Sequence, residues 1–309
     1  MPADLNLTLK YKNSQVFNIK QRFSPDFIFE GESVYFFYTY IRKNASTSFK
    51  KLFQALYPYA CPGDLPSIRC MLEHTQVKGL TPEQIDQRFA TKLFVYRDPI
   101  DRVFSVYKNK LIQQDGAEDL LSRLEKVVGR DPALLTFHEF VHEYVVLLET
   151  ERWEEVDGHL YPQVWHLLPI TYTKVIRMDN VYKEMRELLP EELCDRSFKE
   201  PYNSTTKGSV PLAWADPDCP AIYFRKKYAR GKALPSLTQL LTPATEAHLR
   251  EVYAYDYRMI EEVEGKPASF MLSETPLPAG FNFSLPFMVE EVAHERDLGL
   301  DFSPQENSN

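Results

Sequence analysis

Apolar stretches of two kinds alternate along this chain. Residues 34–41 (VYFFYTYI) are β-branched and aromatic on both sides of an extended chain. Such a run is typical of a central parallel strand that is covered on both faces. A second strand is predicted at residues 92–96 (KLFVY) and a third at residues 173–177 (TKVIR). Residues 49–56 (FKKLFQAL) instead repeat apolar side chains at the spacing of one helix face.

Proline and threonine mark where the predicted helices begin. Pro99 follows the second strand and opens a helix, because its missing N–H costs nothing in the first turn. Thr242 and Pro243 give the same signal for a final helix that runs to residue 264. We expect further helices near 117–128 and 136–150. The alternation of strands and helices predicts an α/β fold with a central parallel sheet flanked by helices.

The composition and net charge say little about the fold, but they restrict which ligands the protein can bind. The chain has 309 residues, 44% of them apolar and 26% charged, as is ordinary for a globular protein. Its formal net charge of −8 argues against non-specific binding to nucleic acid or to an anionic membrane. Any bound anion must therefore be held by local clusters of Arg, Lys and backbone N–H groups. We divide the chain into a leader at 1–33, a globular domain at 34–264, and a Pro-rich extension and tail at 265–309.

The four cysteines are Cys61, Cys70, Cys194 and Cys219, and their spacing fits no metal site. We expect free thiols in a reducing compartment, with a Cys61–Cys70 disulfide as the alternative. No run approaches the ~18 apolar residues of a spanning helix, and the N-terminus has no apolar signal core. The sequence therefore predicts neither a membrane span nor a secretion signal.

The loop after the first strand, residues 42–48 (RKNASTS), is typical of an anion site. A helix that starts after such a loop presents unpaired N–H groups and the positive end of its dipole, and small side chains allow an anion close approach. Lys43 stands at the entrance, where an ammonium can stabilise charge on a leaving oxygen. The spacing GxxxxGK[ST] is absent, which argues against a nucleotide kinase or hydrolase. An ordinary capped helix start is the alternative.

A second strand, loop and helix follow in residues 92–111 (KLFVYRDPIDRVFSVYKNKL). Arg97 lies where the strand ends, and Ser105 lies two helical turns further on. Because the carboxyl ends of parallel strands meet at one sheet edge, both side chains can reach one anion. A guanidinium fork and a hydroxyl suit a phosphate monoester.

These segments together resemble the carbohydrate sulfotransferases (sulfotransferase family 2), especially the branch that acts on chondroitin, dermatan and related glycans. The lysine loop of that family matches residues 42–48, and its arginine–aspartate–proline motif with a following arginine, serine and tyrosine matches residues 97–107. Its histidine–aromatic–x–proline–glutamine element matches residues 159–163 (HLYPQ). Its closing tyrosine–x–x–aspartate helix matches Tyr253 and Asp256. The resemblance suggests a bacterial member and implies a P-loop-like, three-layer sulfotransferase fold.

The resemblance also implies a donor, 3′-phosphoadenosine 5′-phosphosulfate, whose product is 3′-phosphoadenosine 5′-phosphate, and no metal. The loop would hold the phosphosulfate, Lys43 would stabilise the leaving phosphate, and Arg97 with Ser105 would bind the 3′-phosphate. Lys207, in NSTTKGS, would belong to a polar lid, although by itself this segment reads as a surface turn. The implied cofactor contacts are Arg42, Lys43, Asn44, Ala45, Ser46, Thr47, Ser48, Arg97, Ser105 and Lys207. Arg42 departs from the family pattern, which has proline there.

In-line displacement at sulfur needs a base for the acceptor hydroxyl. The catalytic candidates are therefore Lys43, His159 and His74. His159 lies in HLYPQ, with Asp157 beside it as an orienting group or as a base itself. His74 lies between the two cofactor motifs, where related enzymes carry a catalytic histidine or glutamate. A structural role for either histidine is the alternative.

For several other charged residues the sequence allows two interpretations. Arg102 is either a ligand contact or a partner of Asp98 or another acid, and Lys110 reads as a solvated helix lysine that could instead face the acceptor. A basic stretch, which could line a groove for an anionic glycan or form a solvated helix face, comprises Arg225, Lys226, Lys227, Arg230 and Lys232.

The acceptor implied by the resemblance is a hydroxyl of a carbohydrate, either glycosaminoglycan-like or a capsular or surface polysaccharide. The alternatives are a small-molecule or lipid sulfotransferase, and a protein of the same fold that binds the cofactor without catalysis. We expect a bacterial cytoplasmic enzyme, with a Golgi catalytic domain that lacks its anchor as the alternative.

Overall fold

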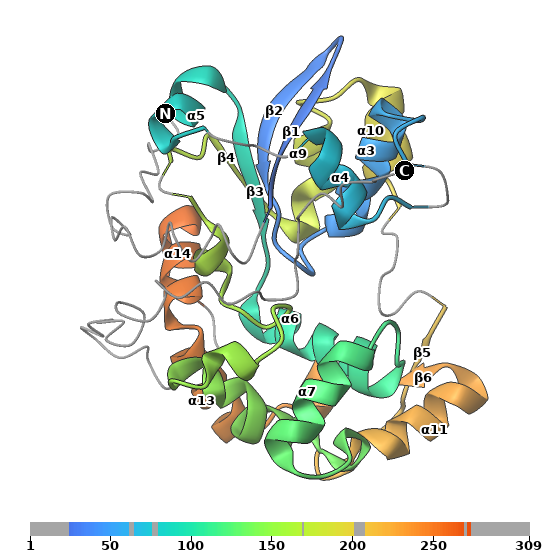
Figure 1. Cartoon of the computed structure of the whole chain (residues 1–309). Coiled ribbons are helices and arrows are strands. Elements are labelled where there is room, and N and C mark those ends of the chain that lie inside the picture. Colours follow the sequence, from blue (N-terminus) through green and yellow to red (C-terminus); the bar gives the residue numbers. More distant parts are fainter. Residues whose placement is uncertain are drawn as a thin grey trace, which may run out of the picture. The chain divides into compact units, whose positions relative to one another are not determined.

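The computed structural model describes residues 25–61, 65–75, 80–168, 170–200, 208–268 and 271–272. A four-stranded sheet runs through this part of the chain in the order β1 (Asp26–Gly31), β2 (Val34–Thr39), β3 (Lys92–Tyr96) and β4 (Lys174–Arg177). Strand β1 pairs antiparallel with β2, whereas β2, β3 and β4 are parallel (Figure 1). The fold is a mixed α/β fold with a mostly parallel central sheet flanked by helices, which confirms the predicted class.

The central strands follow the apolar runs closely. Strand β3 occupies the predicted residues 92–96 and is buried at every position. Strand β2 ends at Thr39, two residues before the predicted end, and the turn of the following loop begins at Arg42. Strand β1 was not predicted and lies within the stretch that we interpreted as a leader. Only Phe27 and Phe29 are buried in it, which is too short an alternation to identify an edge strand.

One face of the sheet is covered by α3 (Ser46–Leu56), α4 (Ile68–Thr75), α9 (Val181–Met185) and α10 (Glu191–Phe198), which gather beside β1 and β2 in Figure 1. A largely aromatic core joins these helices to the strands. The rings of Tyr38 in β2 and Phe49 in α3 stack with their centroids 3.7 Å apart. This pair fixes the first turn of α3 against the strand that precedes its loop.

The remaining helices are α5 (Pro82–Arg88), α6 (Pro99–Val106), α7 (Glu118–Val128), α8 (Phe137–Glu139), α11 (Ala221–Gly231), α12 (Leu237–Leu240), α13 (Pro243–Val252) and α14 (Ala254–Glu264). Helix α6 continues into a π-helical segment, Tyr107–Ile112, and a two-residue strand pair joins β5 (Val210–Pro211) to β6 (Ala233–Leu234). Short 3₁₀ segments lie at Pro132–Leu134, Val145–Glu149, Trp153–Glu155, Gln163–His166 and Met178–Asn180.

Two predicted helices are broken. Residues 136–150 begin with a Thr136 capping box but pass into a π-helical segment, Phe140–Tyr144, and then a 3₁₀ segment. The sequence there is apolar on too many sides for a regular amphipathic helix. The final helix is interrupted at Tyr253, whose buried hydroxyl donates to the carbonyl oxygen of Leu160.

The expectation of four free thiols is wrong for one pair. Cys61 and Cys70 form a disulfide with Cα atoms 6.2 Å apart, a usual separation, whereas Cys194 and Cys219 are free. Because disulfides are rare in reducing compartments, the cysteines do not support a cytoplasmic location. Among the residues described, no helix has the length and apolar character needed to cross a membrane.

Candidate active site

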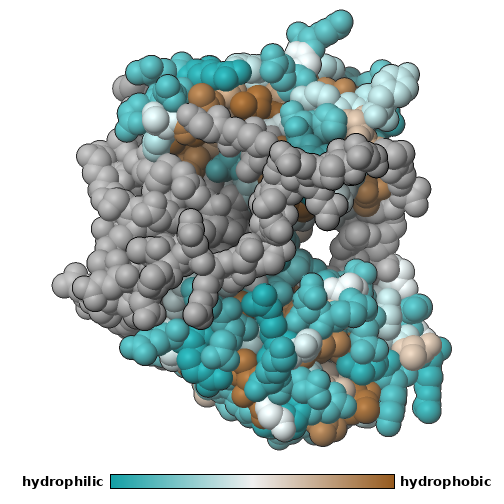
Figure 2. Space-filling view, viewed as in Figure 1, coloured by the Kyte–Doolittle hydropathy of each residue, from teal (hydrophilic) through white to brown (hydrophobic). Residues whose placement is uncertain are grey.

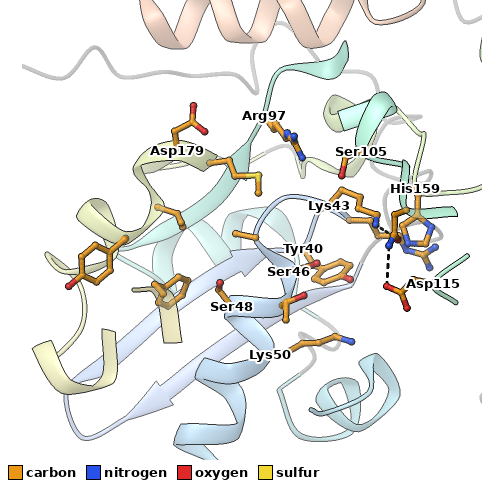
Figure 3. Close-up of a pocket in the computed structure, with 18 of the residues that line it drawn as sticks. Tyr40, Lys43, Ser46, Ser48, Lys50, Arg97, Ser105, Asp115, His159 and Asp179 are labelled. Atoms are coloured by element: carbon orange, nitrogen blue, oxygen red, sulfur yellow. Dashed lines mark hydrogen bonds between the residues drawn. The ribbon is translucent and has the colours of Figure 1, made fainter. Parts of the chain in front are cut away.

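A cavity of about 690 Å³ opens where the three parallel strands end. Its walls come from the loop after β2, the strand end and helix after β3, and the segment after β4 (Figure 3). Arg97 and Ser105 lie next to each other on one side of Lys43, and His159 lies on another (Figure 3). The segments that the sequence singled out therefore meet in one pocket.

The loop after β2 has an unusual backbone. Lys43 and Ala45 adopt left-handed conformations, with φ values of 67° and 56°. For residues with a side chain this costs of order 1–3 kcal/mol each, and such a conformation gathers successive N–H groups into an anion-binding concavity. Helix α3 then starts at Ser46 with no side-chain cap. This overturns the alternative of an ordinary capped helix start, and Ser46 and Thr47, which begin the helix, line the cavity.

Asn44 differs from its neighbours because its side chain points into the protein. It is fully buried, and its Nδ2 donates to the carbonyl oxygen of Val95 at 2.8 Å and to Gln163 Oε1 at 2.6 Å. Its backbone N–H donates to the carbonyl oxygen of Ile41. Asn44 therefore anchors the loop and does not line the cavity, whereas Ala45, Ser46, Thr47 and Ser48 do.

Gln163 is the centre of a buried polar network. Its Oε1 accepts from the backbone N–H of Arg97 at 2.9 Å, and its Nε2 donates to the carbonyl oxygen of Arg97 at 2.8 Å. Asp256, which is also fully buried, accepts from the backbone N–H groups of Gln163 and Val164. These bonds tie the HLYPQ element and the closing helix to the end of β3 and, through Asn44, to the lysine loop.

Arg102 joins the same segments by a different route. Its side chain is fully buried, Nε donates to the carbonyl oxygen of Arg42 at 3.2 Å, and Nη1 donates to the carbonyl oxygen of Tyr161 at 2.8 Å. The predicted pairing with Asp98 is wrong, because Asp98 instead caps α6 by accepting from the N–H groups of Ile100 and Asp101.

Lys43 is held by an amide. Its Nζ donates to Asn109 Oδ1 at 2.6 Å, and Asn109 Nδ2 donates to Asp115 Oδ2 at 3.1 Å. Burial, followed by the charge of Lys110, lowers the pKa of Lys43 to about 8. At neutral pH the ammonium is charged and directed at the cavity, but it is close enough to titration for pH to matter.

The second motif supplies further cations. Arg97 and the buried Ser105 line the cavity together with Lys108, whose pKa is lowered first by burial and then by Arg97. Lys110 is buried and donates to the carbonyl oxygens of Asp115 and Gly116, so the interpretation as a solvated helix lysine is wrong. The π-helical segment that carries Lys108 and Lys110 widens the helix next to the cavity, as such segments often do at functional sites.

His159 and Asp157 form a pair. His159 Nδ1 lies 2.6 Å from Asp157 Oδ1, which also accepts the backbone N–H of His159 at 2.8 Å. Burial lowers the pKa of His159 to about 4, against the opposing influence of Asp157. The imidazole is therefore neutral at pH 7, and a proton on Nδ1 leaves Nε2 as a proton acceptor. His159 lines the cavity, so the geometry brings it together with Lys43.

The other predicted residues lie elsewhere. His74 is on α4, where Nδ1 contacts the carbonyl oxygen of Cys70 and the ring packs edge-on against Phe53, and it does not line the cavity. Lys207 lies outside the described residues. On α11, Arg225 donates to the carbonyl oxygen of Leu111, whereas the exposed cations on this helix and at its C-cap are Lys226, Lys227, Arg230 and Lys232. None of these α11 residues lines the cavity, and Figure 2 shows hydrophilic side chains projecting in this region.

Sequence reasoning missed several lining residues. Lys50 lies one turn after Ser46 on α3, and Lys108 lies three residues after Ser105, so helical spacing could have identified both. Tyr182 and Lys199 come from the helices after β4, and no local pattern signals that they reach this cavity. Within the described chain, no group of three or more His, Cys, Asp or Glu side chains is arranged to hold a metal ion.

Comparison with known proteins identifies a family for this chain. A family model with the description "Sulfotransferase family" matches residues 25–260, which begins next to strand β1 and ends within α14. No curated protein and no solved structure matches the chain.

Proposed function

The chain belongs to the sulfotransferase family, and from this premise we propose that it transfers a sulfuryl group from 3′-phosphoadenosine 5′-phosphosulfate to a hydroxyl of a carbohydrate. The observation that carries the proposal is the joint presence of two features in one cavity. The start of α3, which has no side-chain cap, lines the same cavity as Lys43 and as His159, whose ring is paired with Asp157.

The donor set fits a nucleotide with a phosphate and a phosphosulfate. The N–H groups at the start of α3, with Lys43, would hold the phosphosulfate, because they supply positive potential without a side-chain cap in competition. Arg97, Ser105 and Lys108 would hold the 3′-phosphate, which distinguishes this donor from ATP. When bound, the donor supplies a sulfuryl group that is activated by its phosphate leaving group.

The protein's own residues accept the proton of the acceptor and stabilise the charge on the leaving phosphate. His159 Nε2 accepts the proton of the acceptor hydroxyl while the new sulfur–oxygen bond forms and the bond to the phosphate oxygen breaks. Asp157 holds the imidazole in the required tautomer and stabilises the imidazolium. Lys43 neutralises the charge that develops on the leaving phosphate, and Asn109 fixes its ammonium.

A carbohydrate acceptor is favoured by the resemblance of the motifs and by the charged side chains of the cavity walls, which include six Lys and Arg residues besides Lys43. A small phenol or lipid acceptor on the same fold is the second candidate. A polymeric anionic glycan would also find the exposed cations of α11 beyond the cavity, and this contact stays a prediction. A bacterial cytoplasmic location and a Golgi location both stay open proposals, with the Cys61–Cys70 disulfide against the former.

Two measurements test the proposal. Sulfur-labelled donor is incubated with the protein and with desulfated glycosaminoglycans, capsular polysaccharides and simple phenols. Label on a polysaccharide is expected, and label on phenols alone would favour the second candidate. Tight binding of 3′-phosphoadenosine 5′-phosphate without transfer to any acceptor would favour a cofactor-binding protein that lacks catalysis.

The donor assignment is tested separately by calorimetry. Arg97→Ala should weaken binding of 3′-phosphoadenosine 5′-phosphate by about tenfold or more, because a charge-assisted fork is lost. The same substitution should leave the affinity for adenosine 5′-phosphosulfate, which lacks the 3′-phosphate, nearly unchanged. An equal effect on both ligands would contradict the role given to Arg97.

A further inference from the structure

The amide that holds Lys43 is itself held by a carboxylate. Asn109 Oδ1 accepts from the ammonium of Lys43 at 2.6 Å, and Asn109 Nδ2 donates to Asp115 Oδ2 at 3.1 Å (Figure 3). A side-chain amide has an accepting end and a donating end, and only the accepting end can face an ammonium. An ionised carboxylate accepts but cannot donate, so Asp115 selects the orientation in which Asn109 Oδ1 faces Lys43. Asp115 therefore acts on the ammonium through Asn109.

The backbone after α6 keeps Asp115 next to Asn109. The π-helical segment Tyr107–Ile112 is followed by a close return, in which the backbone N–H of Asp115 donates to the carbonyl oxygen of Asn109 at 3.1 Å. Gln114 and Gly116, on either side of Asp115, adopt left-handed conformations with φ values of 60° and 50°. A residue with a side chain, such as Gln114, rarely adopts this conformation, so the turn depends on the contacts that hold it.

Lys110 supplies such a contact. Its buried ammonium donates to the carbonyl oxygen of Asp115 at 2.7 Å and to that of Gly116 at 2.6 Å. These two charge-assisted bonds fix the backbone that carries the carboxylate. Asn109, Lys110 and Asp115 are therefore one hydrogen-bonded unit, and all three line the cavity with Lys43.

The same unit influences the protonation of Lys43. The charged groups that act on this ammonium from the surrounding elements are Lys110, Arg97, Asp115 and Asp157. Burial and the two cations lower the pKa of Lys43, whereas the two carboxylates raise it, and Asp115 has the larger influence of the two. His159, which also lines the cavity, is neutral at pH 7 and opposes neither. Asp115 thus favours the charged form of the lysine as well as its placement.

We propose that Asp115 is a positioning residue for sulfuryl transfer, which acts through Asn109 to hold the ammonium of Lys43 in place for the leaving phosphate oxygen. Asn109 occupies one N–H group of the ammonium, and two remain for the donor. This inference rests on the proposed function, because it gives Asp115 a part in the charge stabilisation assigned to Lys43. Asp115 belongs to none of the motifs that resemble the sulfotransferase family.

Two substitutions separate the orientation of the amide from the charge of the carboxylate. Asp115→Ala removes both and should lower kcat by about tenfold, because a misplaced ammonium stabilises the transition state poorly. Asp115→Asn keeps an oxygen that accepts from Asn109 Nδ2, so it should recover most of kcat. Both should bind 3′-phosphoadenosine 5′-phosphate within about threefold of the wild type in calorimetry. Asp119→Asn, which removes an exposed carboxylate on α7, is the matched control and should leave kcat unchanged.

The titration of Lys43 gives a readout that does not depend on turnover. The rate at which an acylating reagent labels Lys43 is followed against pH by peptide mass spectrometry. Asp115→Ala and Asp115→Asn should both titrate Lys43 at lower pH than the wild type, because a carboxylate that favours the ammonium is lost. The alkaline limb of kcat/KM should move in the same direction.

The inference is overturned if Lys43 titrates in both Asp115 variants as it does in the wild type, or if Asp119→Asn lowers kcat as much as Asp115→Ala does. It is also overturned if Asp115→Ala weakens the nucleotide as much as it lowers kcat. Failure of the proposed function would appear separately, as absence of transfer by the wild type while the titration of Lys43 still shifts in the variants.

Discussion

Arg102 Nη1 lies 2.8 Å from the carbonyl oxygen of Tyr161, and the same guanidinium reaches the carbonyl oxygen of Arg42 through Nε. One fully buried side chain thus spans the loop of the proposed charge-stabilising lysine and the segment of the proposed base. Both loops are irregular, so their separation depends on buried side chains that join them, namely Arg102 and the Asn44–Gln163 pair, and not on a regular element.

Arg102→Lys should therefore lower kcat more than it weakens donor binding. A single ammonium keeps the charge but cannot reproduce two directed bonds to separate carbonyl groups. We expect kcat to fall by about ten- to a hundredfold, because small misplacements of reacting groups are costly. Steady-state kinetics and calorimetry with 3′-phosphoadenosine 5′-phosphate check this, with Arg123→Lys on α7 as control. A uniform loss of folded protein, with kcat unchanged per folded molecule, would mean a purely structural role.

A second prediction concerns the contribution of Gln163 to the stability of the fold. Gln163→Glu removes the donor to the carbonyl oxygen of Arg97 and sets a carboxylate against Asp256, whose Oδ2 now accepts from Gln163 Nε2 at 3.2 Å. The free energy of unfolding should fall by about 2–4 kcal/mol, since buried polar groups lose their partners. Denaturant titration measures it.

Asp256→Asn in the Gln163→Glu background provides the control. An amide at position 256 can donate to the new carboxylate, so the double variant should be less destabilised than the sum of the two single variants. Additive losses would show that the two side chains are not energetically coupled.

The pH dependence follows from two groups that line the cavity, His159 and Lys43. Burial lowers the pKa of His159 to about 4 and that of Lys43 to about 8. The base must be neutral and the lysine charged, so kcat/KM should rise as pH increases through about 4 and fall as pH increases through about 8.

Lys43→Arg isolates the alkaline limb. Arginine stays protonated throughout, so this variant should keep its kcat/KM at pH values where the wild type declines. A wild-type profile that is flat through the alkaline range, or an alkaline limb that Lys43→Arg does not move, would assign that limb to another group.

Much of the fold could be predicted from local pattern. The apolar residues 93–96 and the proline at 99 indicated the position of β3 and the start of α6, because burial on both faces and a fixed φ are strong local constraints. The edge strand β1 and the breaks at Phe140 and Tyr253 could not be predicted, since they depend on partners far away in the sequence. Tyr253, for example, is fixed by the carbonyl oxygen of Leu160.

In the candidate site, too, the sequence predicted which residues gather but not how each side chain is directed. Lys43, Arg97, Ser105 and His159 line one cavity, as their motifs predicted. The direction of a side chain was harder to predict: Asn44 lies between lining residues but turns inward to Gln163, because the left-handed residues on either side rotate the loop. Helical spacing alone also gave no indication that Lys110 would be buried by a π-helical turn.

The central claim is that Lys43 stabilises the leaving phosphate during sulfuryl transfer, and single-turnover transfer from labelled donor tests it most directly. Lys43→Ala should transfer the label about a hundred- to a thousandfold more slowly than the wild type, because a charge placed for the transition state is lost. Binding of 3′-phosphoadenosine 5′-phosphate, measured on the same preparation, should remain detectable through the N–H groups of α3 and Arg97. Transfer by Lys43→Ala at the wild-type rate would contradict the account.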